Sequence, residues 1–89
     1  MPQAVVDPEE LREFARSLKK FNNELRDRTR ALNSQLSGLG ETWRDQEHLK
    51  FVQRFQDGMR MIARFLENND RHVPYLLRKA EVIDEYLRS

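Results

Sequence analysis

Cysteine is absent from the 89 residues of this chain, which excludes a disulfide framework, a thiol nucleophile and a cysteine-based zinc site. No apolar run approaches the roughly 18 residues that a membrane span requires, and no basic segment followed by an apolar run indicates a classical signal peptide. Sixteen basic and fifteen acidic side chains leave a net charge of +1. This balance argues against partners held by bulk electrostatics alone, whether nucleic acid or anionic membrane.

The side chains that enzymes and metal sites commonly use are few and scattered. The two histidines, His48 and His72, lie far apart along the chain, and Asp45 near His48 does not complete a metal site. No glycine-rich phosphate loop is present, and no serine has a histidine and an acid at a recognisable spacing. We therefore expect no enzymatic activity, no metal, no cofactor and no small-molecule substrate.

The chain is rich in charge and in leucine and phenylalanine. Charged residues make up 35% and hydrophobic residues 38% of it, with a mean hydropathy of −0.87. This composition has too much Leu and Phe for a disordered chain.

Two prolines bear on where helices begin. Asp7 followed by Pro8 predicts a helix start, because Asp caps free N–H groups and Pro has none. Pro74 leaves the heptad phase unchanged, which favours one kinked, continuous helix over a third helix that starts there.

Two glycines and a capping pattern predict how the chain is divided. Gly38 and Gly40 indicate a helix end and a turn, and Thr42 followed three positions later by Asp45 is typical of a capping box. We expect one domain, 1–89, with a first helix over about 8–37, a tight turn at 38–41 and a second helix over about 43–87.

Apolar residues recur at the three- and four-residue spacing of helices that pack as in a coiled coil, and no alternating strand pattern competes. The first stripe consists of Leu11, Leu18, Leu25, Leu32 and Leu39, with Phe14 and Phe21 between them. The second stripe runs through Val52, Phe55, Met59, Ile62, Leu66, Asn69, Val73, Leu76, Ala80, Ile83 and Leu87, where only Asn69 is polar. The predicted fold class is all-α, an antiparallel hairpin of two long helices.

The helix lengths predict an uncovered C-terminal segment. A chain that folds back at 39–41 places antiparallel partners at positions that sum to about 81, so that Leu18 meets Ile62 and Phe14 meets Leu66. On this register the first helix ends opposite about residue 73, and large aliphatic side chains beyond it would forgo about 1.5–3 kcal/mol each if left in water. A second chain is therefore expected to cover them.

A second row on the same predicted helix supports assembly. Phe51, Gly58 and Phe65 recur every seven residues beside the main stripe, and a broad stripe of this kind suits a four-helix bundle. A mid-helix glycine costs about 1 kcal/mol relative to alanine, which is explained if another backbone approaches it, although a tolerated weak spot is the alternative. We expect a two-fold dimer of hairpins that forms a four-helix bundle. Its expected interface consists of Phe51, Gly58, Phe65, Leu76, Leu77, Ala80, Ile83 and Leu87.

Trp43, the single tryptophan, follows the predicted turn. It either seals the open end of the hairpin against Leu36 and Leu39 or offers a recognition handle to a partner. Three features stand together here: the segment Leu36-Ser37-Gly38-Leu39 before the turn, Trp43 at mid-chain, and Phe51 eight residues later. In these features the chain resembles the WXG superfamily, the early-secreted-antigen-like small proteins of type VII secretion. The resemblance covers nearly the whole chain and implies homodimeric or heterodimeric four-helix bundles.

Two positions depart from the family pattern. Asp45 stands where the family has the glycine of its Trp-x-Gly turn, so that Trp43 and Asp45 form the turn motif of this chain. The family's C-terminal export signal, Tyr-x-x-x-Asp/Glu, is missing, since Tyr75 is followed at that spacing by Lys79.

The resemblance implies a non-enzymatic substrate or partner subunit of a type VII secretion system. Its partners would be a second copy or a related helical hairpin, together with the secretion machinery. The protein would be cytoplasmic before export and secreted without a classical signal peptide. The residues alone leave two alternatives: a cytoplasmic oligomerisation adaptor, and a helical nucleic-acid binder that uses the basic side chains of 12–30 and 50–64.

Overall fold

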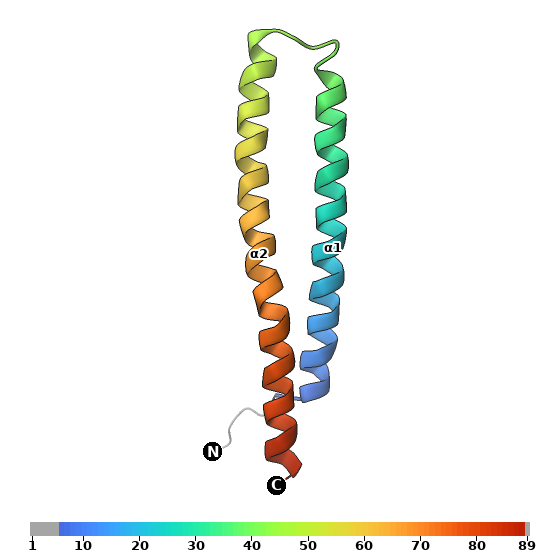
Figure 1. Cartoon of the computed structure of the whole chain (residues 1–89), viewed down its shortest axis with the longest axis vertical. Helices are drawn as coiled ribbons and strands as arrows, with labels where there is room; N and C mark the ends of the chain where they lie inside the picture. Colours follow the sequence, from blue (N-terminus) through green and yellow to red (C-terminus); the bar gives the residue numbers. More distant parts are fainter. Residues whose placement is uncertain (1–5, 89) are drawn as a thin grey trace.

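The computed structural model describes residues 6–88, and two long α-helices form an antiparallel hairpin within them (Figure 1). Helix α1 spans Pro8–Leu39 and helix α2 spans Gln46–Arg88. The molecule is a rod with extents of 67, 22 and 15 Å. No strand occurs among the described residues, and the predicted all-α hairpin is confirmed.

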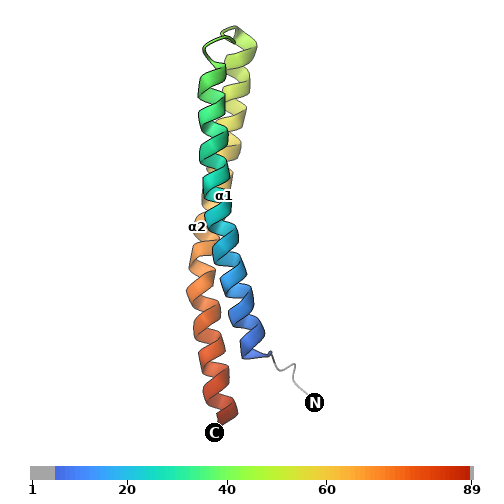
Figure 2. The same ribbon diagram turned by 90° about the vertical axis from the view of Figure 1, so that its right-hand side faces the viewer.

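The helices cross at an angle instead of running strictly side by side. In Figure 1 they converge toward the C-terminal end of α2, whereas in Figure 2 they overlap near the turn and separate toward the other end. Helix α2 continues without a break through Pro74, so that no third helix starts there.

The start of α1 follows from its first residues. The side chain of Asp7 accepts a hydrogen bond of 2.9 Å from the backbone N–H of Glu9, and Pro8 occupies the first turn, where no N–H partner is needed. Glu9 and Glu10 add negative charge beside the positive end of the helix dipole. The N-cap predicted at Asp7 is therefore confirmed.

The turn lies later in the chain than its glycines predict. Gly38 is inside α1, and Gly40 is the C-cap with φ −64° and ψ −13°, an ordinary right-handed conformation. No residue in the described range 6–88 has a positive φ. Because the chain leaves α1 without a left-handed residue, the glycines do not force an early stop, and the connection occupies 40–45 instead of 38–41.

The stripe predicted on α2 faces α1 along almost its whole length. Leu66, Asn69 and Ala80 are buried, and the other apolar members from Val52 to Ile83 are half-buried. Leu87 is the exception, because it is mainly exposed near the end of the helix.

The stripe predicted on α1 is only half correct. Its first three leucines are half-buried, but Phe14 and Phe21 point outward, and the positions between the leucines are filled by Ala15 and Asn22, both buried. The leucine column belongs to both possible stripes. Asn69 on α2 decides between them, because a buried amide needs a polar partner and Phe offers none.

The predicted register of the two helices is also wrong, because Asn69 pairs with Asn22. A sum of 81 would place Phe21 near residue 60 and Asn22 near residue 59. Instead, the ring centroids of Phe21 and Phe65 lie 6.3 Å apart, and Asn22 is hydrogen-bonded to Asn69.

The shifted register lets α1 cover most of the C-terminal segment. Arg12, near the start of α1, forms an ion pair with Asp84. Ala80 is fully buried, and Leu76 and Ile83 are half-buried, so that the expectation of an uncovered segment is wrong at these three positions. Leu77 and Leu87 remain exposed.

Candidate functional site

The turn between the helices is closed by the last carbonyls of α1. The backbone N–H groups of Trp43 and Thr42 donate to the carbonyl of Leu39 over 2.9 and 3.2 Å, and that of Glu41 donates to Gly38 over 3.2 Å. These bonds satisfy carbonyls that a helix end leaves without partners. The hydroxyl of Thr42 also donates to the carbonyl of Leu39.

Asp45 is the N-cap of α2. Its Oδ1 accepts a hydrogen bond of 3.0 Å from the backbone N–H of His48, and α2 begins at the next residue, Gln46. The predicted capping box is therefore wrong in its register, because Asp45 itself caps the helix and Thr42 belongs to the turn. An aspartate at the family's glycine position thus has a local structural role.

Removal of this cap has a measurable consequence. Asp45→Ala is expected to lower the free energy of unfolding by about 1 kcal/mol, because the N–H of His48 loses its acceptor. Asp45→Asn keeps an acceptor oxygen and is expected to stay within about 0.5 kcal/mol of the parent protein. Urea unfolding followed by circular dichroism measures both changes, and equal losses in the two variants would contradict the capping role.

The indole of Trp43 packs against the start of α2. Its ring centroid lies 4.9 Å from that of His48 and 5.9 Å from that of Phe51, with interplanar angles of 67° and 40°. Phe51 in turn lies 6.0 Å from Phe55. Trp43 belongs to the turn, not to the first position of the second helix, and this row of rings holds it in a defined orientation.

His48, in the first turn of α2, contacts Trp43, and the sequence did not single it out as such a contact. A Cβ on Gly40 would lie 3.5 Å from its Nε2, an ordinary contact, and 3.3 Å from the carbonyl of Ser37, a tighter one, so that the imidazole lies directly beside Gly40. The sequence could have indicated this position of His48 through Asp45, three residues earlier. A helix cap at Asp45 places His48 in the first turn of α2.

One side of the hairpin, which we term the ionic edge, is joined by ion pairs between the helices. Arg12 pairs with Asp84, and Arg26 pairs with Asp70. The hydrogen bond to Asp84, helped by a second one to Glu9, raises the pKa of the Arg12 guanidinium. Both interhelical pairs lie at least partly in solvent, so they contribute to the register more than to stability.

A polar layer crosses the hairpin next to this edge. It consists of Asn22, Asn69, Asp70 and Arg26. Nδ2 of Asn69 donates to Oδ1 of Asn22 over 3.1 Å, and Nδ2 of Asn22 donates to Oδ1 of Asp70 over 3.2 Å. Because both buried amides have partners, the layer avoids the cost of unsatisfied polar groups and disfavours registers that separate them.

The opposite side of the hairpin, which we term the apolar side, carries exposed aromatic rings. It consists of Phe14, Phe21, Phe51, Gly58 and Phe65. Phe21 and Phe65 meet edge to face, with an interplanar angle of 87°, yet Phe65 remains 49% exposed. A Cβ on Gly58 would meet no heavy atom within 4 Å. This side is therefore open, unlike the ionic edge.

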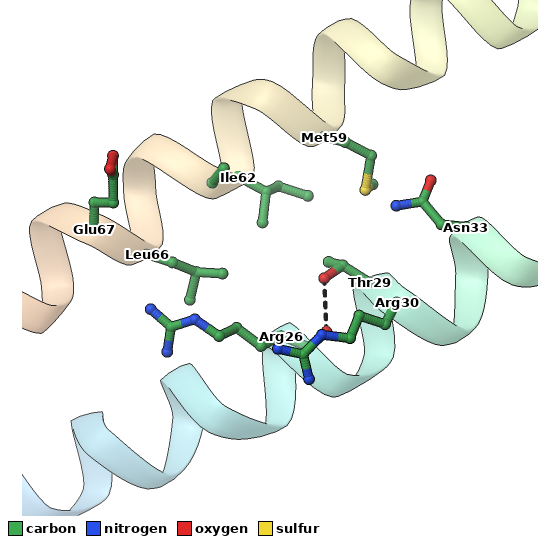
Figure 3. Close-up of a pocket in the computed structure, with 9 residues that line it drawn as sticks. Arg26, Thr29, Arg30, Asn33, Met59, Ile62, Leu66 and Glu67 are labelled. Carbon is green, nitrogen blue, oxygen red and sulfur yellow. Dashed lines mark hydrogen bonds between the residues drawn. The ribbon is translucent and has the colours of Figure 1, made fainter.

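A groove of about 430 Å³ lies between the helices (Figure 3). Arg26, Thr29, Met59 and Leu66 are among its lining residues, and the hydroxyl of Thr29 donates to the carbonyl of Arg26 over 2.9 Å. The lining also includes the carboxylate of Glu67, but the hydroxyl of Thr29 is bonded to the backbone and not to this carboxylate, so that the two do not form a nucleophile and base pair. Across 6–88, no three His, Asp or Glu side chains are grouped so that they could hold a metal ion.

These features define the class of protein as a small α-helical hairpin. The WXG100 family, described as proteins of 100 residues with WXG, matches residues 3–84, and the chain belongs to that family. No curated protein and no solved structure matches the chain. No helix in the described range is both long and apolar enough to cross a membrane.

Membership of the WXG100 family implies general properties that its members share. WXG100 proteins are small helical proteins of the type VII secretion kind, which leave the cell without signal peptides, form dimers and are generally non-enzymatic. The part of Trp43 and Asp45 in such a role, and the residues of any partner interface, belong to the proposal below.

Proposed function

We propose that this protein is a substrate or partner subunit of a type VII secretion system and that it acts as a folded helical dimer. Its partners are a second copy and the secretion machinery, and it is cytoplasmic until export. The observation that carries the proposal is the WXG100 match over residues 3–84, supported by the tryptophan that aromatic contacts hold at the turn. Tyr75 does not begin the family's Tyr-x-x-x-Asp/Glu signal, because Lys79 stands at the acidic position, so a partner chain supplies that signal or the machinery reads other residues.

The surface area of the hairpin supports assembly. A compact monomer of 10.7 kDa exposes about 5,500 Å², whereas this chain exposes 7349 Å². The excess is roughly twice the 800 Å² or so that each partner buries in a standard interface. The apolar side is the place where burial gains most, because its phenylalanines are 45–58% exposed, and each would gain about half of the roughly 1.5–3 kcal/mol that full burial of an exposed side chain gives.

The interface expected from the sequence must be revised accordingly. Leu76, Ala80 and Ile83 are used within the hairpin, so we propose that Phe51, Gly58 and Phe65 form the centre of the partner interface. Leu77 and Leu87 remain available outside this centre.

Export is tested in a host with an intact type VII system. The tagged protein is expected in the culture medium of that host and not in the medium of a strain that lacks the translocation ATPase. Trp43→Ala is expected to reduce the exported amount to the level of that strain, because the turn loses the ring that the machinery reads. The matched control is Leu49→Ala, which removes another exposed apolar side chain near the turn and should leave export unchanged.

The intracellular amount and the helical content of each variant separate a recognition defect from unfolding. Retention of the parent protein in a host that exports other substrates would overturn the proposal and favour an oligomerisation adaptor. Equal export of Trp43→Ala and the parent protein would remove the turn from the mechanism.

A further inference from the structure

The aromatic column of α2 is symmetric about a glycine. Phe51 and Phe65 lie seven residues before and after Gly58, a spacing of about 10.5 Å along the helix on nearly the same face. Seven residues further in each direction the column becomes polar, at Arg44 in the turn and at His72 on α2. The apolar part of the column is thus centred on Gly58 and has similar ends.

The hairpin itself gives no reason for a glycine at position 58. The residue lies inside α2, its φ is not positive, and a Cβ would meet no heavy atom within 4 Å. A glycine inside a helix is disfavoured relative to alanine. The missing side chain becomes useful where a second helix approaches α2 closely.

We propose that a second copy of this chain packs on the apolar side about a two-fold axis that passes next to Gly58. The two α2 helices then run antiparallel, with their glycines face to face and Phe51 of each copy against Phe65 of the other. This inference rests on the dimer of the proposed function and adds its register and contacting residues.

The column pattern favours a second copy over an unrelated partner. In a two-fold interface, a residue that contacts a second position of the partner must itself be contacted by that position. Pairing about Gly58 meets this condition with apolar side chains on both members, because Phe51 and Phe65 exchange places. Pairing about Phe65 would instead set Phe51 against Lys79, a charged residue.

Helix α1 adds to this contact within each copy. Phe21 supports Phe65 edge to face, so that a Phe51 ring from the partner meets two rings instead of one. Arg28 and Gln35 continue the column of Phe21 on α1 as polar residues, which leaves α2 as the centre of the contact. Their long side chains can reach solvent from the rim of an interface.

The absence of native cysteine allows a direct test by disulfide cross-linking. Gly58→Cys is expected to link to itself under mild oxidation, because a two-fold axis brings the two positions within the Cα separation of a disulfide. Phe51→Cys alone and Phe65→Cys alone should stay unlinked, because equivalent atoms then lie about 21 Å apart along the helices. An equimolar mixture of these two variants is expected to give the linked dimer.

The outcomes distinguish this inference from the proposed function. Self-linking of all three variants would indicate a parallel dimer and overturn the inference. Self-linking of Phe65→Cys alone would place the axis at that residue and also overturn it. A parent protein that sediments as a dimer while none of the variants links would overturn the register and leave dimerisation intact. A parent protein that sediments as a monomer at high concentration would overturn both, whereas export is judged separately in the host.

A second variant does not depend on disulfide chemistry. Gly58→Leu is expected to weaken dimerisation by about tenfold or more, because the added side chains collide where the helices cross. Its helical content should be retained, because the space around Gly58 within one copy is open. The control is Gln53→Leu, an exposed position of α2 off the column, which should dimerise like the parent. An unchanged dimerisation constant for Gly58→Leu would contradict close approach at this residue.

Discussion

Leu66→Ala is expected to lower the free energy of unfolding by about 3 kcal/mol, one of the two largest effects that a change in this chain should produce. Leu66 is 5% exposed, and the other buried apolar residues in the described range are the alanines Ala15 and Ala80. The loss combines the transfer free energy of the removed atoms with the cost of the cavity left between the helices. Because native domains have only about 5–15 kcal/mol of stability, this loss is a large fraction of the total.

Leu49→Ala is the matched control for this experiment. It makes the same substitution on the same helix at a residue that is 62% exposed, and its effect should stay within about 0.5 kcal/mol. Urea unfolding followed by circular dichroism gives both values, and a concentration series separates the contribution of dimerisation from that of the hairpin. Similar losses in the two variants would contradict the position of Leu66 in the core.

The second large effect concerns the polar layer. Asn22→Leu is expected to cost about 1–3 kcal/mol, because Nδ2 of Asn69 loses its acceptor while it stays buried and Asp70 loses a donor. Asn22→Leu combined with Asn69→Leu removes both amides, and the double variant is expected to be more stable than the single one. The control is Asn23→Leu, whose parent side chain is exposed on the next position of α1.

The double variant should differ from the parent in register and not in stability alone. With an uninterrupted apolar seam, several registers of the two helices have similar free energy, whereas the paired asparagines favour one of them. We expect one set of backbone amide resonances for the parent protein and additional sets for the double variant. A double variant that shows a single set of resonances would contradict the role of the polar layer in register choice.

Much of the hairpin could be predicted from its sequence because α2 has one continuous stripe. The spacing from Val52 to Ile83 identifies the buried face without ambiguity. On α1 the leucine column is shared by two stripes, one completed by phenylalanines and the other by Ala15 and Asn22. Periodicity cannot choose between two stripes of the same period, since a choice requires knowledge of the partner helix.

The signal that resolves the choice was present in the sequence. Asn69 interrupts the stripe of α2, and a search for its polar partner leads to Asn22, the asparagine at a seam-compatible position of α1. The error in the turn has a similar origin, because Thr42 and Asp45 are both good caps and only the three-dimensional path of 40–45 decides between them. Because Ala15 and Asn22 face α2, Phe14 and Phe21 are left on the exposed apolar side.

The unequal lengths of the two helices have a consequence for the ends of a dimer paired about Gly58. Helix α2 has 43 residues against 32 in α1, and Gly58 lies nearer the turn than the C-terminus. Two copies that share an axis there overlap around their turns, and the last 14 or so positions of each α2 overhang the partner by about 21 Å. Each pole of the assembly would then display the end of α2 of one copy, packed against the start of its own α1, beside the Trp43 turn of the other copy. A receptor docked at a single pole would thereby contact the turn of one copy and the end of α2 of the other at once, although these two parts lie at opposite ends of each molecule.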